Sequence, residues 1–196
     1  KILQNSQPKN VQSRDKEASF LSRVLIVKTS SLGDIVQSFH VLDDLHRRFP
    51  AVAVDWAVEV PFASIVAAHP LVRRAIPLDI KRRANLWAGL TELRREVYDI
   101  VFDLQGNCKS GVVTLLARGK VKVGYDFKSV REWPNILATD VRFRVSKQKN
   151  IRLYYLELID RYFQRASSGE MEGVCFNIEP EEKEKIAQIL GQVPNQ

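Results

Sequence analysis

Short apolar stretches rich in β-branched residues alternate with longer amphipathic stretches along most of this chain. The apolar stretches lie at 24–28, 52–58, 74–78, 99–104 and 120–124. Strands that alternate in this way with helical patterns are typical of a parallel sheet covered by helices. We therefore expect an α/β fold, a Rossmann-like parallel sheet with helices on both faces.

The stretches between these strands carry apolar residues at helical spacing. The first helix is expected from Asp34 to Phe49, with Ile35, Phe39 and Leu42 facing inward, and Pro50 ends it. Later helices are expected from about Pro61, over 86–97, from Gly106 to Gly119 and over 151–165. Between the last two, residues 131–145 indicate a loop, a turn of helix and a late strand.

Beyond Arg165 the pattern weakens. A linker is expected near 167–173, a lone strand at 174–178 and a charged helix at 180–190. We therefore expect a disordered polar extension over 1–22, a Rossmann-like domain over 23–165, and a linker with the start of a missing domain over 166–196.

The junction VLIVKTSSLGD at 24–34 joins a buried strand to a turn and a helix start. Gly33 is expected to free the backbone there, and Asp34 places a carboxylate at the carboxyl end of a parallel strand, where ligands of such folds usually bind. Asp34 could simply cap the helix, but Ser30 and Ser31 already offer capping oxygens. A carboxylate beside Lys28 could instead accept a proton from a substrate hydroxyl.

A second polar junction, DIVFDLQGNCKS at 99–110, follows another predicted strand. Gln105, Asn107 and Lys109 would line the same edge as the first junction if the two strands are neighbours. The alternative, that Gln105 and Asn107 only satisfy a turn, stays open. Neither junction has the GxGxxG or P-loop spacing, so those routes to nucleotide binding have no support.

The net charge of +7 and the pI near 9.5 favour an anionic partner. Seven cations crowd residues 73–95, which a solvated surface would also explain. The two cysteines, Cys108 and Cys175, have no metal-site or disulfide spacing. No apolar run approaches a membrane span and no signal peptide is evident, so a cytoplasmic protein is expected.

Several motifs in order resemble the ADP-heptose:lipopolysaccharide heptosyltransferases of glycosyltransferase family nine, and most of all the type that adds the first inner-core heptose. They are VLIVKTSSLGDIV at 24–36, DWAVEVPFASIVAAHPLVRRAIPLDIKR at 55–82, YDIVFDLQGNCKSG at 98–111 and GYDFKSVRE at 124–132. The resemblance runs from about Arg23 to about Phe163.

The resemblance implies the amino-terminal, acceptor-binding half of a GT-B glycosyltransferase that transfers heptose from ADP-heptose to Kdo-lipid A with inversion. Asp34 falls on the catalytic base of the family, which would deprotonate the acceptor hydroxyl. Ser30 and Ser31 would face the donor phosphates. No metal and no other cofactor is implied, and the chain alone is expected to be inactive because a GT-B cleft needs two walls.

The resemblance also gives part of the basic cluster a role, since Kdo-lipid A carries carboxylates and phosphates. The acceptor-binding cations would be Lys28, Lys81, Arg82, Arg83, Lys109 and Arg131. Four of them, Lys81, Arg82, Arg83 and Arg131, would also hold the protein at the cytoplasmic face of the inner membrane. Arg73, Arg74, Arg94 and Arg95 are better explained as a solvated surface. At Asn150 the chain departs from the His that the family often carries, so we assign no role to this segment.

A different class of function would be a non-catalytic, basic Rossmann-like module that binds nucleic acid or anionic lipid. The three tryptophans Trp56, Trp87 and Trp133 are scattered, without the interleaving of aromatic and basic residues that typifies a nucleic-acid surface. We therefore expect no nucleic-acid partner.

Overall fold

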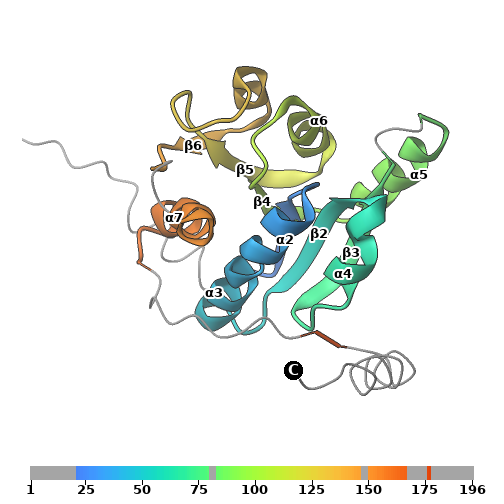
Figure 1. The fold of residues 1–196 in the computed structure, drawn as a ribbon, viewed down its shortest axis with the longest axis horizontal. Coiled ribbons are helices and arrows are strands. Elements are labelled where there is room, and N and C mark those ends of the chain that lie inside the picture. The colour runs from blue at the N-terminus through green and yellow to red at the C-terminus, as the bar shows by residue number, and fades with distance from the viewer. Residues whose placement is uncertain (1–20, 80–82, 147–149, 167–175, 178–196) are drawn as a thin grey trace, which may run out of the picture.

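Six parallel strands form one sheet in the computed structural model, which describes residues 21–79, 83–146, 150–166 and 176–177 (Figure 1). The strands are β1 (Arg23–Val27), β2 (Ala53–Glu59), β3 (Val72–Leu78), β4 (Tyr98–Asp103), β5 (Gly119–Tyr125) and β6 (Val141–Phe143). Their order is β3-β2-β1-β4-β5-β6, and every neighbouring pair is parallel. The predicted strands and the parallel sheet are confirmed, and the strand order reverses between β1 and β4.

Helices cover both faces of this sheet, as expected. They are α2 (Leu32–Ser38), α3 (His40–Arg48), α4 (Ala63–Ala67), α5 (Arg83–Leu93), α6 (Cys108–Leu116) and α7 (Ile151–Phe163), with two 3₁₀ turns, η1 (Val60–Phe62) and η2 (Trp133–Ala138). The turn of helix and late strand expected within 131–145 are η2 and β6. None of the helices among the described residues combines the length and the apolarity needed to cross a membrane.

Alternate residues of β1 build the two halves of the core. Val24 and Ile26 pack in one cluster with side chains of α2, α3, α4 and α7, while Leu25 and Val27 pack in a second cluster with side chains of α5 and α6. These four side chains are fully buried, whereas Arg23 at the start of β1 is exposed. A strand segment that helices cover on both faces buries all its side chains. This explains why the sequence of β1 from Val24 to Val27 is a continuous apolar run.

The single helix expected from Asp34 to Phe49 is two helices. Its inward positions Ile35, Phe39 and Leu42 are buried as expected. The hydroxyl of Ser38 donates a 2.7 Å hydrogen bond to the carbonyl of Ile35, and the Phe39 amide bonds the Val36 carbonyl rather than that of Ile35. A serine hydroxyl that bonds the preceding turn bends a helix, so α2 ends and α3 begins around Phe39.

Two glycines have roles other than those expected. Gly119 does not end α6 but opens β5, where a Cβ would lie 2.5 Å from a methyl carbon of Val101. Gly33 lies inside α2 with open space around it, so its backbone requires no glycine. The glycine that takes positive φ among the described residues is Gly106, at 68°, in the turn between β4 and α6.

Most of the flanking regions lie outside the described residues. These include 1–20, 167–175 with Cys175, and the helix expected at 180–190. Two residues of the expected linker and strand are described: the Phe176 ring packs on those of Phe39 and His69, and the Asn177 amide donates to the Ala68 carbonyl at 2.7 Å.

Candidate active site

A pocket opens at the carboxyl ends of β1 and β4, the two central strands between which the strand order reverses. Its volume is about 320 Å³, and it is lined by Lys28, Asp34, Leu104, Gln105, Ser129, Arg131, Ile151, Tyr154 and Tyr155. Ligands of open α/β sheets bind at this kind of position because the loops on either side diverge and leave a crevice. The structure thus brings the two polar junctions of the sequence together in one site.

Lys28 and Asp34 form an ion pair at the base of this pocket. The Lys28 side chain is buried, and its Nζ lies 3.4 Å from Oδ2 of Asp34, whose side chain is 30% exposed. Nζ also lies over the Tyr155 ring, 5.2 Å from its centre. Burial lowers the pKa of Lys28 to about 8, although Asp34 and Asp103 favour the charged form. Asp34 is therefore paired with a buried cation, and the exposed part of its carboxylate faces the pocket.

The serine turn connects β1 to this pair. Ser31 is the N-cap of α2 but its side chain makes no capping hydrogen bond, and Asp34 in the first turn bonds Lys28. The amide of Ser30 donates to Oε1 of Gln105 at 3.3 Å, which ties the first junction to the second. The Ser30–Ser31 peptide bond is cis. The structure thus gives Asp34 an ion pair with Lys28, where the alternative interpretation gave it a capping hydrogen bond.

Asp103 organises the second junction, although the sequence analysis assigned it no role. It is completely buried, and its Oδ1 accepts the amides of Gln105 and Gly106 at 3.0 and 2.9 Å. Its Oδ2 accepts from Thr114 and Asn135 at 3.1 and 2.6 Å. Burial raises the pKa of this carboxyl, while these hydrogen bonds oppose the rise. The signal in the sequence is a carboxylate that directly follows the apolar residues 100–102 at the end of the strand.

Asn107 and Ser110 behave as the bland alternative predicted. They form a capping box at the start of α6, in which each side chain bonds the other residue's amide at 2.9 and 3.1 Å. Gln105 combines both interpretations, because it lines the pocket and also holds the Ser30 amide.

The start of α7 supplies one wall of the pocket, although no role was assigned to this segment. The Tyr154 ring stacks on Tyr125 with centres 4.9 Å apart, and its hydroxyl donates to the Ser129 carbonyl at 2.9 Å. Burial raises the pKa of Tyr154 to about 12 and raises that of Tyr155 as well, so both stay neutral at ordinary pH. Their regular helical spacing concealed this role, because it is also the spacing of core residues.

The predicted cations separate into three groups. Lys28 and Arg131 line the pocket, whereas Lys109 is exposed in the first turn of α6 and is not part of the lining. Lys81 and Arg82 lie outside the described residues. Arg83, expected in a loop, begins α5, but its side chain also lies outside them.

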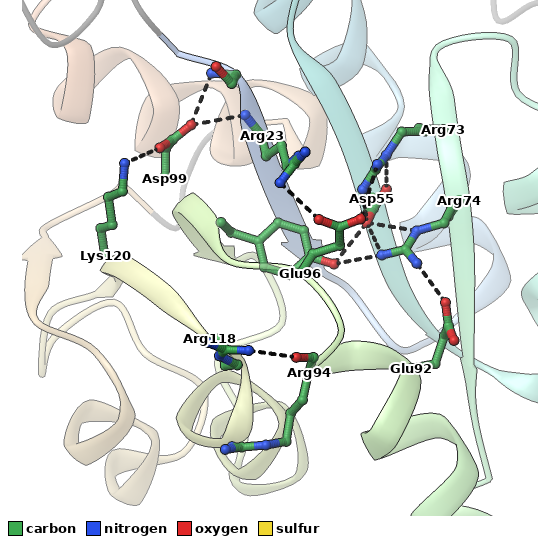
Figure 2. Close-up of polar contacts among 12 residues, drawn as sticks. Arg23, Asp55, Arg73, Arg74, Glu92, Arg94, Glu96, Asp99, Arg118 and Lys120 are labelled. Atoms are coloured by element: carbon green, nitrogen blue, oxygen red, sulfur yellow. Dashed lines mark hydrogen bonds and ion pairs between the residues drawn. The ribbon is translucent and has the colours of Figure 1, made fainter.

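Of the other arginines, Arg94 and Arg95 are exposed, as expected for a solvated surface, whereas Arg73 and Arg74 share a buried partner. Arg73 and Arg74 both bind the fully buried carboxylate of Asp55 near the amino ends of the strands, away from the pocket (Figure 2). Arg95 pairs with Glu92, and Arg94 donates to the Leu116 carbonyl at 2.9 Å. Arg73 and Arg74 therefore stabilise the fold through a buried counterion, while Arg94 and Arg95 make only exposed contacts.

Metal chemistry would need a cluster of ligands. Within the described ranges, no group of three or more His, Cys, Asp or Glu side chains is placed to hold a metal ion. Cys108 is a free, exposed thiol at the start of α6.

Comparisons with known proteins agree on one group. A family model described as glycosyltransferase family 9 (heptosyltransferase) matches residues 86–186. Lipopolysaccharide heptosyltransferase 1 of Salmonella typhimurium is 40% identical over 139 residues, which is 65% of this chain and 44% of that protein.

Solved structures of heptosyltransferases also match this chain. E. coli heptosyltransferase WaaC with ADP superposes with a TM-score of 0.71 at 35% identity, over 76% of this chain and 49% of that one. The same enzyme with ADP-2-deoxy-2-fluoro heptose gives 0.70 at 34% identity, over 77% and 51%. The chain therefore spans about half the length of the relatives it matches.

Proposed function

Since this chain belongs to glycosyltransferase family 9, the heptosyltransferases, as its motifs indicated, we propose that it forms the acceptor-side wall of an enzyme that transfers heptose from ADP-heptose to Kdo-lipid A. The observation that carries the proposal is the Asp34 carboxylate, 30% exposed at the pocket and backed by buried Lys28. Its fold supports the same assignment, since the sheet is that of one half of a GT-B enzyme.

In the proposed reaction Asp34 takes the proton of an acceptor hydroxyl as that oxygen attacks the anomeric carbon of the donor. The bond from that carbon to the diphosphate breaks, and ADP leaves with the electron pair. The configuration of the anomeric carbon is inverted, because the acceptor oxygen attacks the face of that carbon opposite the leaving diphosphate. A single base on the acceptor side is enough for this step, so no second carboxylate is required of this wall.

The remaining predicted residues take binding roles in this proposal. Arg131 and Lys28 would favour an anionic acceptor, because Arg131 lines the mouth of the pocket and Lys28 its base. Ser30 and Ser31, at the start of α2, would face the donor phosphates. Lys81, Arg82, Arg83 and Lys109 would extend the cationic surface for the acceptor.

The direct test supplies ADP-heptose and Kdo-lipid A to the intact protein that carries this chain. We expect ADP release and an acceptor product heavier by one heptose, measured by mass spectrometry. The 196-residue chain, assayed in parallel, is expected to give no product. If the intact protein formed no heptosylated product although both substrates remained intact, the assigned activity would be wrong.

Lys28 predicts the pH dependence of this activity. Its ammonium, with a pKa of about 8, pairs with Asp34 only while protonated, and Arg131, Asp103 and the Tyr155 ring are its other close partners. As the pH rises through 8 the cation is lost, so kcat/KM is expected to fall along a limb near that pH. Lys28→Met should lower kcat/KM about tenfold at pH 7 and remove the limb.

The matched variant for this experiment is Lys28→Arg, which keeps a cation that does not titrate in this range. It should extend activity to higher pH even if its maximum is lower. An unchanged alkaline limb in Lys28→Met would assign the titration to another group.

A further inference from the structure

A buried carboxylate lies next to the pocket without lining it. Asp103 is completely buried, and the two residues that follow it in the chain both line the pocket. Its Oδ1 accepts two backbone amides of the next turn, and its Oδ2 accepts from the side chains of Thr114 and Asn135. A buried charge is costly unless such bonds compensate it. The segments that supply these donors therefore indicate what the carboxylate does.

The first of these segments is the turn that follows β4. Gly106, whose amide donates to Asp103 at 2.9 Å, has a φ of 68°, a conformation that residues with a side chain rarely adopt. The carbonyl of Gly106 accepts the amides of Arg131 and Glu132, both at 3.0 Å. Asp103 thus fixes the turn to which residues 131–135, here called the Arg131 loop, are bonded.

The second segment is the far end of the Arg131 loop. Asn135, in η2, is 1% exposed, and its Nδ2 donates to Oδ2 of Asp103 at 2.6 Å and to the Asn107 carbonyl at 2.9 Å. Because that carbonyl can only accept, the nitrogen of the Asn135 side chain, rather than its oxygen, faces these two atoms. The loop is therefore held at its start through Gly106 and at its end by Asp103 directly.

The Gln105 side chain extends this network to the turn after β1. It lines the pocket, and its Oε1 accepts the Ser30 amide at 3.3 Å. Its own backbone amide donates to Asp103 at 3.0 Å. Since Arg131 lines the pocket as well, two polar groups of the lining depend on one carboxylate that is not itself part of the lining.

Asp103 also acts on the pocket through its charge. The N–H groups that bond it can only donate, so they favour the ionised carboxylate and oppose the rise in its pKa that burial causes. The negative charge favours the Lys28 ammonium, as that of Asp34 does, whereas Arg131 disfavours it. The Tyr155 ring lies against the same ammonium. Asp103 therefore offsets part of the positive charge that the two cations bring to the pocket.

We propose that Asp103 is a positioning residue for the reaction, which holds Arg131 and Gln105 in the arrangement that binds an anionic acceptor without touching that acceptor. Its charge supports the Lys28 ammonium from inside the fold. The inference rests on the proposed function, since it takes the acceptor to enter this pocket. Positioning of this kind has large effects, because a misplacement of about 1 Å can cost about a hundredfold in rate.

Two substitutions separate positioning from stabilisation, because Asn135 and Thr114 bond the same oxygen of Asp103 from different elements. Asn135→Ala releases the Arg131 loop, whereas Thr114→Val releases only α6. In the intact protein, Asn135→Ala should raise KM for Kdo-lipid A about tenfold and change KM for ADP-heptose less than about twofold. Thr114→Val should leave both KM values within about twofold. Thermal unfolding curves report the loss of stability in each variant.

Asp103→Asn removes the charge and keeps the size of the side chain. It should raise KM for Kdo-lipid A about tenfold or more and move the alkaline limb of Lys28 to lower pH, because the ammonium loses a nearby negative charge. NMR of isotope-labelled lysine follows the same titration without substrates, with Lys28→Arg to assign the signal. A purely structural carboxylate would not move this titration.

Asp99 supplies the matched control for Asp103→Asn. It lies on the same strand, β4, and its 22% exposed carboxylate likewise accepts two backbone amides, those of Ser22 and Arg23, both at 3.0 Å. It is not part of the pocket lining. Asp99→Asn should therefore leave KM for Kdo-lipid A within about twofold and the titration of Lys28 in place.

Three results would each overturn the inference: equal increases of the acceptor KM in Asn135→Ala and Thr114→Val, an unchanged acceptor KM in Asp103→Asn, or an unmoved Lys28 titration in that variant. If Asp103→Asn does not fold, the pair of substitutions at Oδ2 decides alone. An inactive wild-type protein would instead refute the proposed function, and the Lys28 titration would still decide whether Asp103 acts on the pocket.

Discussion

Replacing Asp34 by asparagine is expected to lower kcat for heptose transfer by about 100- to 10,000-fold, the usual contribution of a general base. The amide keeps the shape of the side chain and can still accept from Lys28, but it cannot take the proton of the acceptor hydroxyl. The carboxylate is 30% exposed, but its ion-pair partner Lys28 is buried, so the substitution should also lower folding stability to some extent. Measured kcat and a thermal unfolding curve separate the two effects.

Asp43 offers a matched control for this experiment. Its side chain is 28% exposed, nearly the same as Asp34, and it lies in the first turn of α3 outside the pocket lining. Asp43→Asn should retain heptose transfer within about twofold. If Asp34→Asn also stayed within a few-fold of the wild-type protein, the base would have to be sought among the other pocket groups.

The sheet and most of its helices could be predicted because each depends on a local pattern. β1, buried on both faces, must be apolar throughout, and its β-branched residues favour a strand over a helix. The break between α2 and α3 was missed because it depends on one serine hydroxyl that bonds back to Ile35. Gly119 was misassigned because a glycine after a helix and a glycine pressed against Val101 look the same in sequence.

The candidate site could be predicted only where its residues follow strands. Lys28 directly follows β1, Gln105 lies two residues after the end of β4, and Asp34 lies in the first turn of the helix that follows β1, so the fold class alone places them at one edge. Tyr154 and Tyr155 reach the same pocket from α7, more than a hundred residues after β1, and only tertiary packing brings them there. No local signal distinguishes a tyrosine that lines a pocket from one that fills a core.

The arginine cluster shows why a charge run cannot be interpreted without its partners. Asp55 interrupts an apolar strand, and its sequence neighbours give no reason for a buried charge. In the fold, parallel pairing of β2 with β3 sets Asp55 opposite Arg74, and Tyr98 approaches from β4. Two arginines of the group, Arg73 and Arg74, therefore have a structural origin, although the net charge favoured an external anion.

Asp55 is consequently the position where a single substitution should cost the fold most. Its Oδ1 accepts from Arg73 at 2.9 Å, and its Oδ2 accepts from Arg73, Arg74 and Tyr98 at 2.7, 2.6 and 2.8 Å (Figure 2). Burial alone would raise the pKa of this carboxyl, but the hydrogen bonds from the two arginines and the tyrosine outweigh burial and hold the pKa below its usual value.

Asp55→Asn is expected to lower the free energy of unfolding by about 3–5 kcal/mol, because two guanidinium groups lose their shared buried counterion. Glu92→Gln, which removes the 34% exposed partner of Arg74 and Arg95, should cost less than about 1 kcal/mol. Urea unfolding at pH 7 measures the free energy of unfolding of both variants.

The folded pKa of Asp55 lies below the pKa of about 4 that the carboxyl has in the unfolded chain. Its contribution to the free energy of unfolding is therefore complete above about pH 4 and is lost as the pH falls through the folded pKa. The free energy of unfolding of the wild-type protein should therefore fall more steeply below pH 4 than that of Asp55→Asn. If both proteins lost stability equally as the pH fell, the charge of the Asp55 carboxylate would not stabilise the sheet.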